Sequence, residues 1–246
     1  VVGPVTLPKN MASYGGNDSN GDDKNPAGMV YEAIKLAKQQ NPSLNFKDYD
    51  WNNDGEVDQV YLIYAGYGES SDEDGSLANT IWPHEWQLSA ANYKISYDGV
   101  TIDTYGCSPE LLGNESYPVQ MDGIGTACHE FSHCLGLPDL YDTSGSSNSA
   151  FGMDAWSLMD YGCYSDDGYK PTGYTSYERW MSGWLTPKRL TEATTITNMA
   201  ALTESPEAYI IYNDNYPDEY YLLENRQQTG SDLMIEGHGL LVLHVD

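Results

Sequence analysis

Apolar side chains recur at intervals of three and four residues between residues 28 and 40. This period is typical of an amphipathic helix, and the pair Asn41-Pro42 predicts its end. An apolar stripe of this kind needs a partner, so we expect the helix to pack against one face of a sheet.

A different period follows along the chain. Apolar and polar residues alternate over residues 57–65, which predicts a buried strand. Two shorter runs, 93–97 and 100–102, flank the pair Asp98-Gly99, which is typical of a two-residue hairpin turn. A helix is expected again from about Gly123 to Leu135.

The last third of the chain changes from helical to strand patterns. Residues 171–184 carry large apolar side chains at helical spacing, which predicts a helix that begins near a proline. Four short runs typical of strands then follow, at residues 193–198, 208–213, 219–225 and 239–245. We therefore predict an α+β fold for residues 1–186, in which the helix at 28–40 backs a twisted mixed sheet and the helices at 123–135 and 171–184 follow. Residues 187–246 are expected to form a smaller β-rich lobe of the same domain.

Composition excludes one class of partner. Lysine and arginine number 11 against 37 acidic residues, for a net charge of −26 in 246 residues. Phosphate binding needs a basic surface, so nucleic acid is not an expected partner. A chain with this many acidic residues suits a soluble protein outside the cell, and its carboxylates can supply calcium ligands. The alternative is a solvated acidic surface, which explains much of the excess of acidic over basic residues.

The sequence shows no signal peptide and no apolar run of about 18 residues, so no membrane span is predicted. We expect the chain to be a fragment whose leader and flanking segments are missing. The four cysteines allow three pairings if all are bridged, and small buried thiols are the alternative: Cys107, Cys128, Cys134 and Cys163.

Oxygen-bearing side chains occupy alternate positions of one polar segment: Asp50, Asn52, Asp54, Glu56 and Asp58. With Gly55 in the sixth position, the segment matches the first two-thirds of an EF-hand calcium loop. The twelfth position holds Tyr61 where that loop has an acid, so another carboxylate would have to complete the site. We expect calcium here, and the alternative is an Asp/Asn/Gly turn before a strand.

The sequence His-Glu-x-x-His lies at residues 129–133, inside the helix expected at 123–135. On a helix, His129 and His133 share one face and can bind a single zinc ion. Glu130 would then face the water at the metal and act as general base. Alone, such a pattern also arises by chance in helices.

The residues that follow strengthen the interpretation. Gly136 can end the helix in a left-handed conformation, and Pro138 prevents its continuation. The reversed chain would bring Asp139 toward the histidines as third zinc ligand, with Glu224 as the reserve candidate. This order matches the extended metzincin pattern, with aspartate in the place where histidine is commoner.

A second part of that pattern lies downstream at residues 157–162. The segment resembles the methionine turn of metzincins, with Met159 as a packing residue beneath the metal. Tyr161 matches the place of a tyrosine that can stabilise the oxyanion, although a buried core tyrosine is the alternative. His84 could contact substrate, but a structural role is commoner for such a histidine.

Several stretches together resemble the immune inhibitor A family of secreted bacterial metalloproteases. They lie at residues 14–17, 50–58, 64–66, 81–84, 125–142, 219–226 and 239–246. The resemblance covers nearly the whole chain and implies a zinc endopeptidase that is made with a propeptide and exported. It also implies protein or peptide substrates, and we expect a monomer.

The expected reaction is hydrolysis of peptide bonds in extracellular proteins. Zinc held by His129, His133 and Asp139 would activate water, and Glu130 would take its proton. One alternative is a catalytically inactive, calcium-stabilised binding domain of a surface protein, although an inactive site has no need of Glu130. Another is a zinc hydrolase that acts on something other than peptides.

Overall fold

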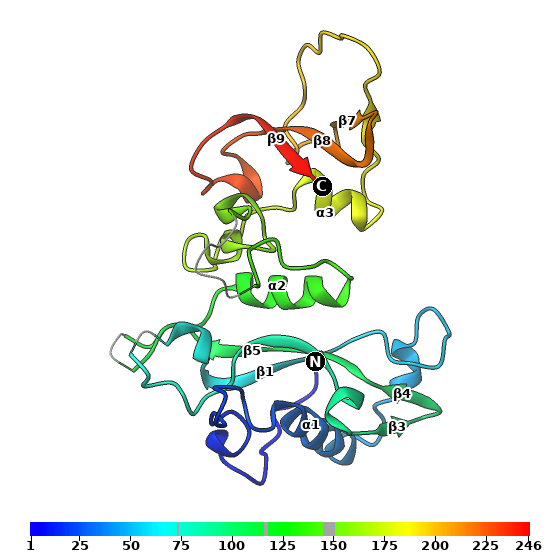
Figure 1. The fold of residues 1–246 in the computed structure, drawn as a ribbon. Coiled ribbons are helices and arrows are strands. Elements are labelled where there is room, and N and C mark those ends of the chain that lie inside the picture. Colours follow the sequence, from blue (N-terminus) through cyan, green and yellow to red (C-terminus); the bar gives the residue numbers. More distant parts are fainter. Residues whose placement is uncertain (73, 116–117, 145–150) are drawn as a thin grey trace. The chain divides into compact units, whose positions relative to one another are not determined.

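The computed structural model describes residues 1–72, 74–115, 118–144 and 151–246. These residues form two compact units, residues 1–122 and 123–246, and each is described by itself (Figure 1). The predicted boundary near residue 186 between a main part and a β-rich lobe stays a prediction.

The sheet of the first unit is mixed, as predicted. Strand β1 (Val60–Tyr67) runs parallel to β5 (Thr104–Leu111), and β2 (His84–Gln87) pairs with the other side of β5 in antiparallel register. Cys107 of β5 stands opposite Leu62 on one side and His84 on the other. The sequence did not predict β5, although it is the central strand.

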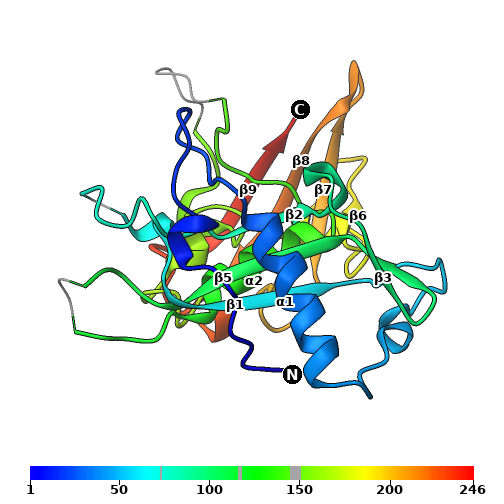
Figure 2. The ribbon, with the colours of Figure 1, turned by 90° about the horizontal axis from the view of Figure 1, so that it is seen from below.

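Helix α1 (Pro26–Gln40) confirms the first predicted element. Asn25 caps it by accepting a hydrogen bond from the Gly28 backbone N–H, and Pro26 occupies the first turn, where a missing N–H costs nothing. The buried stripe of α1 joins one core with Tyr64 of β1 and Tyr105 of β5. Figures 1 and 2 show α1 lying across one face of these strands.

The predicted hairpin is also confirmed. Strands β3 (Ile95–Tyr97) and β4 (Val100–Ile102) pair in antiparallel register. The two turn residues, Asp98 and Gly99, have φ angles of 56° and 87°, as a type I′ turn requires. Short 3₁₀ helices complete the two units: η1 (Met11–Ser13), η2 (Phe46–Tyr49), η3 (Glu69–Ser71), η4 (Ser89–Ala91), η5 (Asp154–Trp156), η6 (Tyr161–Tyr164) and η7 (Gly230–Asp232).

The second unit combines helix α2 (Ile124–Cys134), helix α3 (Ser176–Met181) and one four-stranded sheet. The sheet has the order β6-β7-β8-β9 and buries Ile210, Leu222 and Leu243: β6 (Lys188–Arg189), β7 (Ala208–Asn213), β8 (Tyr216–Arg226) and β9 (Gly239–Val245). Three of the four predicted strands are confirmed. The fourth was wrong, since residues 193–198 form no strand.

Helix α3 is shorter than predicted. It begins at Ser176, where Thr175 and Glu178 form a capping box, and residues 171–174 are not helical. Gly173 packs so closely that a Cβ there would lie 2.4 Å from the Ser231 hydroxyl oxygen. The Gly173 N–H donates to Asp232 Oδ1 at 3.2 Å and its carbonyl accepts from Arg226 Nη2 at 3.3 Å, which are tertiary contacts that the apolar spacing could not indicate.

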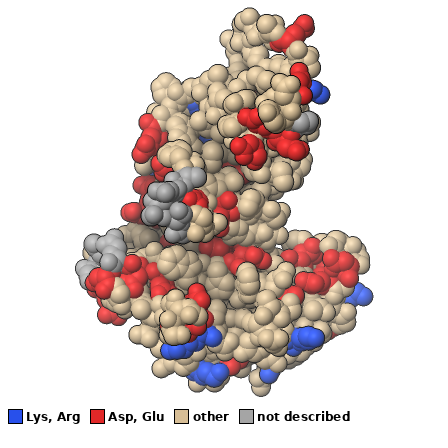
Figure 3. Space-filling model, viewed as in Figure 1, with Lys and Arg blue, Asp and Glu red and all other residues tan. Residues whose placement is uncertain are grey.

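The surface matches the composition. Figure 3 shows acidic side chains spread over both units on the face drawn. None of the four cysteines forms a disulfide, and Cys107 and Cys163 are buried. Within the described residues, no helix is long and apolar enough to cross a membrane.

Candidate active site

The metal motif lies on α2, and glycines set the start of this helix against the segment that follows the methionine turn. A Cβ on Gly125 would lie 1.8 Å from the carbonyl oxygen of Cys163, so only glycine fits. The Gly125 N–H also donates to the Gly168 carbonyl, at 2.9 Å. Residues 163–168 therefore pack directly on the first turn of α2.

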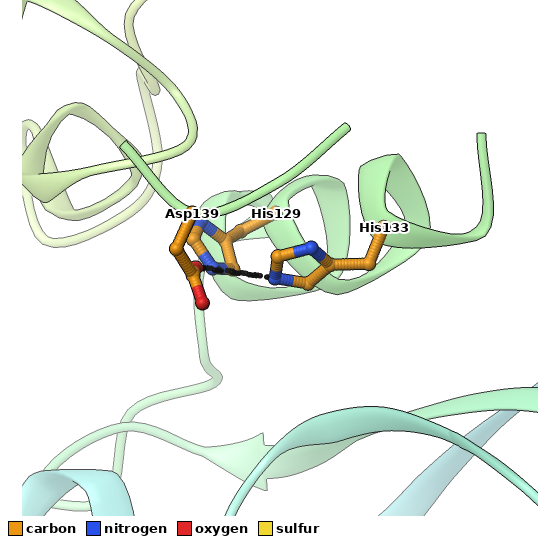
Figure 4. A group of neighbouring side chains, drawn as sticks. All are labelled: His129, His133 and Asp139. Atoms are coloured by element: carbon orange, nitrogen blue, oxygen red, sulfur yellow. Dashed lines mark hydrogen bonds and ion pairs between the residues drawn. The ribbon is translucent and has the colours of Figure 1, made fainter. Parts of the chain in front are cut away.

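The end of α2 has the predicted geometry. Gly136 has a φ of +87°, and its N–H donates to the carbonyl of His133 at 2.8 Å. This left-handed residue turns the chain back toward the helix. As a result, Asp139 lies beside the two histidines although it comes after the helix (Figure 4).

Three ligand atoms converge at this point. The Nε2 atoms of His129 and His133 are 3.2 Å apart, and Asp139 Oδ1 lies 3.2 and 3.3 Å from them. Ligands arranged tetrahedrally at 2.0–2.1 Å around one zinc ion lie about 3.3 Å from one another. The spacing therefore fits zinc. Among the described residues, this is the group of three or more His, Cys, Asp or Glu side chains that could hold a metal ion.

The other nitrogen of each imidazole is already bonded to the backbone. His129 Nδ1 lies 2.9 Å from the Leu158 carbonyl oxygen, and His133 Nδ1 lies 2.8 Å from that of Leu137. A carbonyl oxygen only accepts, so each Nδ1 carries the proton. Both Nε2 lone pairs are thus directed at the point where the three ligands meet, an arrangement typical of metal-binding histidines.

The electrostatics of this group favour a cation. Burial lowers the pKa of His129, but hydrogen bonds to Asp139, Cys163 and Leu158 more than reverse this effect and bring it to about 11. The pKa of His133 is raised in the same way, while the two imidazoles hold the pKa of Asp139 well below its usual range against the effect of burial. Positive charge, as protons or as a metal ion, therefore stabilises these three groups.

Glu130, the predicted general base, is buried, with 8% of its surface exposed. Its charge contributes, after burial, to the raised pKa values of Tyr141 and Tyr164, so its carboxylate lies near both phenols. A base in a partly desolvated, aromatic surrounding suits proton transfer. The role itself stays a prediction.

The predicted methionine turn is connected to the segment that carries Asp139. Met159 is fully buried, and its carbonyl accepts a hydrogen bond from the Leu140 N–H at 2.8 Å. The residue after Asp139 is thereby fixed to the turn whose Leu158 carbonyl binds His129. This arrangement is compatible with the predicted packing role of Met159, which stays a prediction.

Two tyrosines of the second unit differ in their surroundings. Tyr161, the predicted oxyanion group, is 66% exposed, and its ring lies 6.1 Å from that of Tyr164. Tyr141, which sequence reasoning missed, forms a hydrogen bond with Asp139, and burial together with this contact raises its pKa to about 12. Its only sequence signal was its place two residues after the predicted ligand.

The predicted calcium ligands lie in the other unit. Asp50 is 9% exposed, and its two carboxylate oxygens accept hydrogen bonds from the N–H groups of Asp54 and Gly55. Asn52 and Asp54 each accept a hydrogen bond from an N–H group of the same loop, and Asp58 accepts one from the Trp51 N–H. Glu56 is the remaining residue of the predicted set. Calcium binding here stays a prediction.

Two further residues named from the sequence have partners inside the protein. His84 is bonded through its ring to the Trp82 carbonyl and the Tyr105 hydroxyl, at 2.7 and 2.9 Å. Glu224, the reserve zinc ligand, forms an ion pair with Arg226 at 3.0 Å, and both side chains are fully buried.

Comparisons with known proteins agree with the site. Residues 1–189 match the family model of the immune inhibitor A peptidase M6 catalytic domain. Immune inhibitor A of Bacillus thuringiensis subsp. alesti is 28% identical over 188 residues, which are 70% of this chain and 27% of that protein. Pre-pro-metalloprotease PrtV of Vibrio cholerae serotype O1 (strain M66-2) is 30% identical over 190 residues, which are 70% of this chain and 20% of that protein.

The chain thus spans less than a third of the length of either curated relative. The family match nevertheless covers the candidate site, because residues 1–189 include all three candidate metal ligands and Glu130. The resemblance seen in the sequence motifs is confirmed, and the chain belongs to the immune inhibitor A family of M6 peptidases.

Proposed function

We propose that the chain is a zinc-dependent endopeptidase that hydrolyses peptide bonds in extracellular proteins. The observation that carries this proposal is the convergence of His129, His133 and Asp139, with both imidazoles oriented through Nδ1 and both Nε2 atoms directed at one point. Membership of a peptidase family supports the reaction class.

Zinc, when bound, supplies a Lewis acid that polarises the scissile carbonyl and lowers the pKa of water toward about 7. His129, His133 and Asp139 would hold it. Glu130 takes a proton from the attacking water and delivers it to the leaving amine, which is the work of a general base that becomes a general acid. The Tyr161 O–H donates a hydrogen bond to the oxyanion that develops on the substrate.

We also propose that the protein is exported and made as a zymogen. The strongly negative charge supports a location outside the cell, and the name of the Vibrio relative describes that protein as a pre-pro-metalloprotease. A monomer is the oligomeric state we expect.

Metal analysis combined with a proteolysis assay tests the proposal. The purified chain is expected to hold about one zinc per molecule. Casein or gelatin hydrolysis should cease after treatment with a chelator and return when zinc is added. Zinc binding without hydrolysis would instead favour the inactive binding domain, and a chain that binds no zinc would refute the proposal.

A further inference from the structure

Three charged side chains are buried together at the end of β8 and in η7. Arg226 and Glu224 are fully buried, and Asp232 is 1% exposed. Arg226 bonds both carboxylate oxygens of Asp232, at 2.6 and 2.8 Å, and Oε1 of Glu224 at 3.0 Å. All three lie outside residues 1–189, which match the family model.

The guanidinium has two further contacts, both to backbone carbonyls. Nη1 donates to the carbonyl of Trp156 at 3.1 Å, and Nη2 donates to that of Gly173 at 3.3 Å. Every one of its five N–H groups therefore has a partner. Apolar side chains can stabilise a sheet as well as a buried ion cluster does, so the specific contacts to Trp156 and Gly173 need an explanation.

The first contact connects Arg226 to the methionine turn directly. Trp156 is the last residue of η5, and the turn begins at the next residue, Ser157. Because the guanidinium is planar and held on its opposite edge by Asp232, it can position the Trp156 carbonyl in both distance and direction.

A second route reaches the same turn through α3. Glu224 Oε2 accepts a hydrogen bond from the Ser176 N–H, at the start of that helix, at 2.6 Å. Two residues later, Glu178 is fully buried and uses Oε1 to accept from the Ser157 hydroxyl at 2.8 Å and from the Met159 N–H at 3.3 Å. Residues on both sides of Leu158 are thus fixed by buried polar groups.

Leu158 is the residue whose carbonyl binds His129 Nδ1. His133 has no such dependence, because its Nδ1 partner is Leu137, in the turn that follows its own helix. The two zinc ligands are therefore oriented by different parts of the chain. His129 depends on the turn that Arg226 holds, and His133 depends on local structure.

We propose that Arg226 is a positioning residue of the metal centre, which orients His129 through the Trp156–Met159 turn without touching the metal. The inference rests on the proposed function, since it assumes that zinc binds at His129. If the proposal holds, the sheet that contains β8 affects the zinc affinity of the site, which a sheet with only a structural role would not do.

The test is Arg226→Lys in the 246-residue chain. Lysine keeps the positive charge beside Glu224 and Asp232 but cannot supply five N–H groups in a plane. Zinc affinity, measured by competition with a coloured chelator, should fall by about tenfold or more. In NMR spectra of the zinc-loaded protein, the Nδ1–H signal of His129 should shift or broaden, while that of His133 should not change.

Leu243→Ala is the matched control. Leu243 is buried in the same sheet against Ile210 and Leu222, and its apolar side chain cannot hydrogen-bond the ion cluster. It should lower the stability of the unit, yet zinc affinity should stay within about twofold and both histidine signals should keep their positions. If Arg226→Lys does not fold, Glu224→Gln serves in its place, because it keeps the shape and removes the charge that holds Arg226.

The outcomes separate the two proposals. Unchanged zinc affinity and an unchanged His129 signal in the folded variant would overturn the positioning role, while zinc binding by the parent chain would still support the proposed function. If the parent chain binds zinc no better than His133→Ala does, the metal site itself is absent, and both proposals fail. A loss of affinity that Leu243→Ala shares equally would also overturn the positioning role.

Discussion

Two segments carry metal-binding patterns, and the structure shows that their candidate ligand atoms have different hydrogen-bond partners. In residues 129–139, three ligand atoms lie 3.2 to 3.3 Å from one another, and both imidazoles are held from behind by carbonyl groups. In residues 50–58, by contrast, Asp50, Asn52, Asp54 and Asp58 accept hydrogen bonds from N–H groups of their own loop.

The difference shows what a metal motif needs beyond the right residue types. The lone pairs of the three candidate zinc ligands face one another, and their mutual repulsion is relieved only when an imidazole is protonated or a metal ion is bound. The loop oxygens already have donors, so the loop can be stable without an ion. The first segment therefore requires a positive charge, whereas the second only permits one.

The largest expected effect comes from removing one candidate zinc ligand from the first segment. His133→Ala should abolish measurable zinc binding and hydrolysis, because two remaining ligands cannot hold a catalytic zinc ion. Metal analysis after dialysis and a casein assay check this. Asp54→Asn, in the other segment, is the matched control and should leave both quantities unchanged. Zinc retained by the His133 variant would remove this residue from the ligand set.

The next effect separates binding from chemistry within the same site. Glu130→Gln keeps the shape of the side chain but cannot take a proton, so the rate should fall by about 10²–10⁴-fold while zinc content stays the same. The measurement is kcat together with metal stoichiometry. Substantial residual activity would exclude Glu130 as the base.

A smaller effect distinguishes the two tyrosines. Tyr161→Phe should lower kcat by about tenfold or more with zinc affinity unchanged, because it removes an oxyanion donor. Tyr141→Phe should instead weaken zinc binding, since its hydroxyl bonds Asp139. Equal kcat for Tyr161→Phe and the parent chain would contradict the oxyanion role of this exposed residue.

The smallest effect concerns the loop. If calcium binds residues 50–58 with a dissociation constant typical of extracellular sites, about 10 mM calcium should raise the free energy of unfolding by about 1–3 kcal/mol. Thermal unfolding with and without calcium measures this. Asp54→Asn should remove the gain, whereas Asp48→Asn, outside the pattern, should keep it. An equal gain in both variants would assign calcium to another place.

Local patterns predicted many elements because their causes are local. The helix Pro26–Gln40, the helix Ile124–Cys134 and the Asp98-Gly99 hairpin follow from period, caps and turn residues within the segments themselves. Strand β5 was missed because Gly106 and Pro109 weaken its strand pattern. Its position is fixed instead by pairing with β1 and β2 on both sides.

The sequence by itself determined which candidate metal ligands lie together. The spacing of His129 and His133 on a helix, and the left-handed glycine at 136, are short-range properties of the chain, and they were sufficient to predict that Asp139 lies beside both histidines. Only the tertiary structure decided how His129 is oriented, because the Leu158 carbonyl comes from 29 residues away. It also decided that buried charges at the end of β8 reach the same turn, since no local pattern specifies which distant backbone groups a buried arginine will bind.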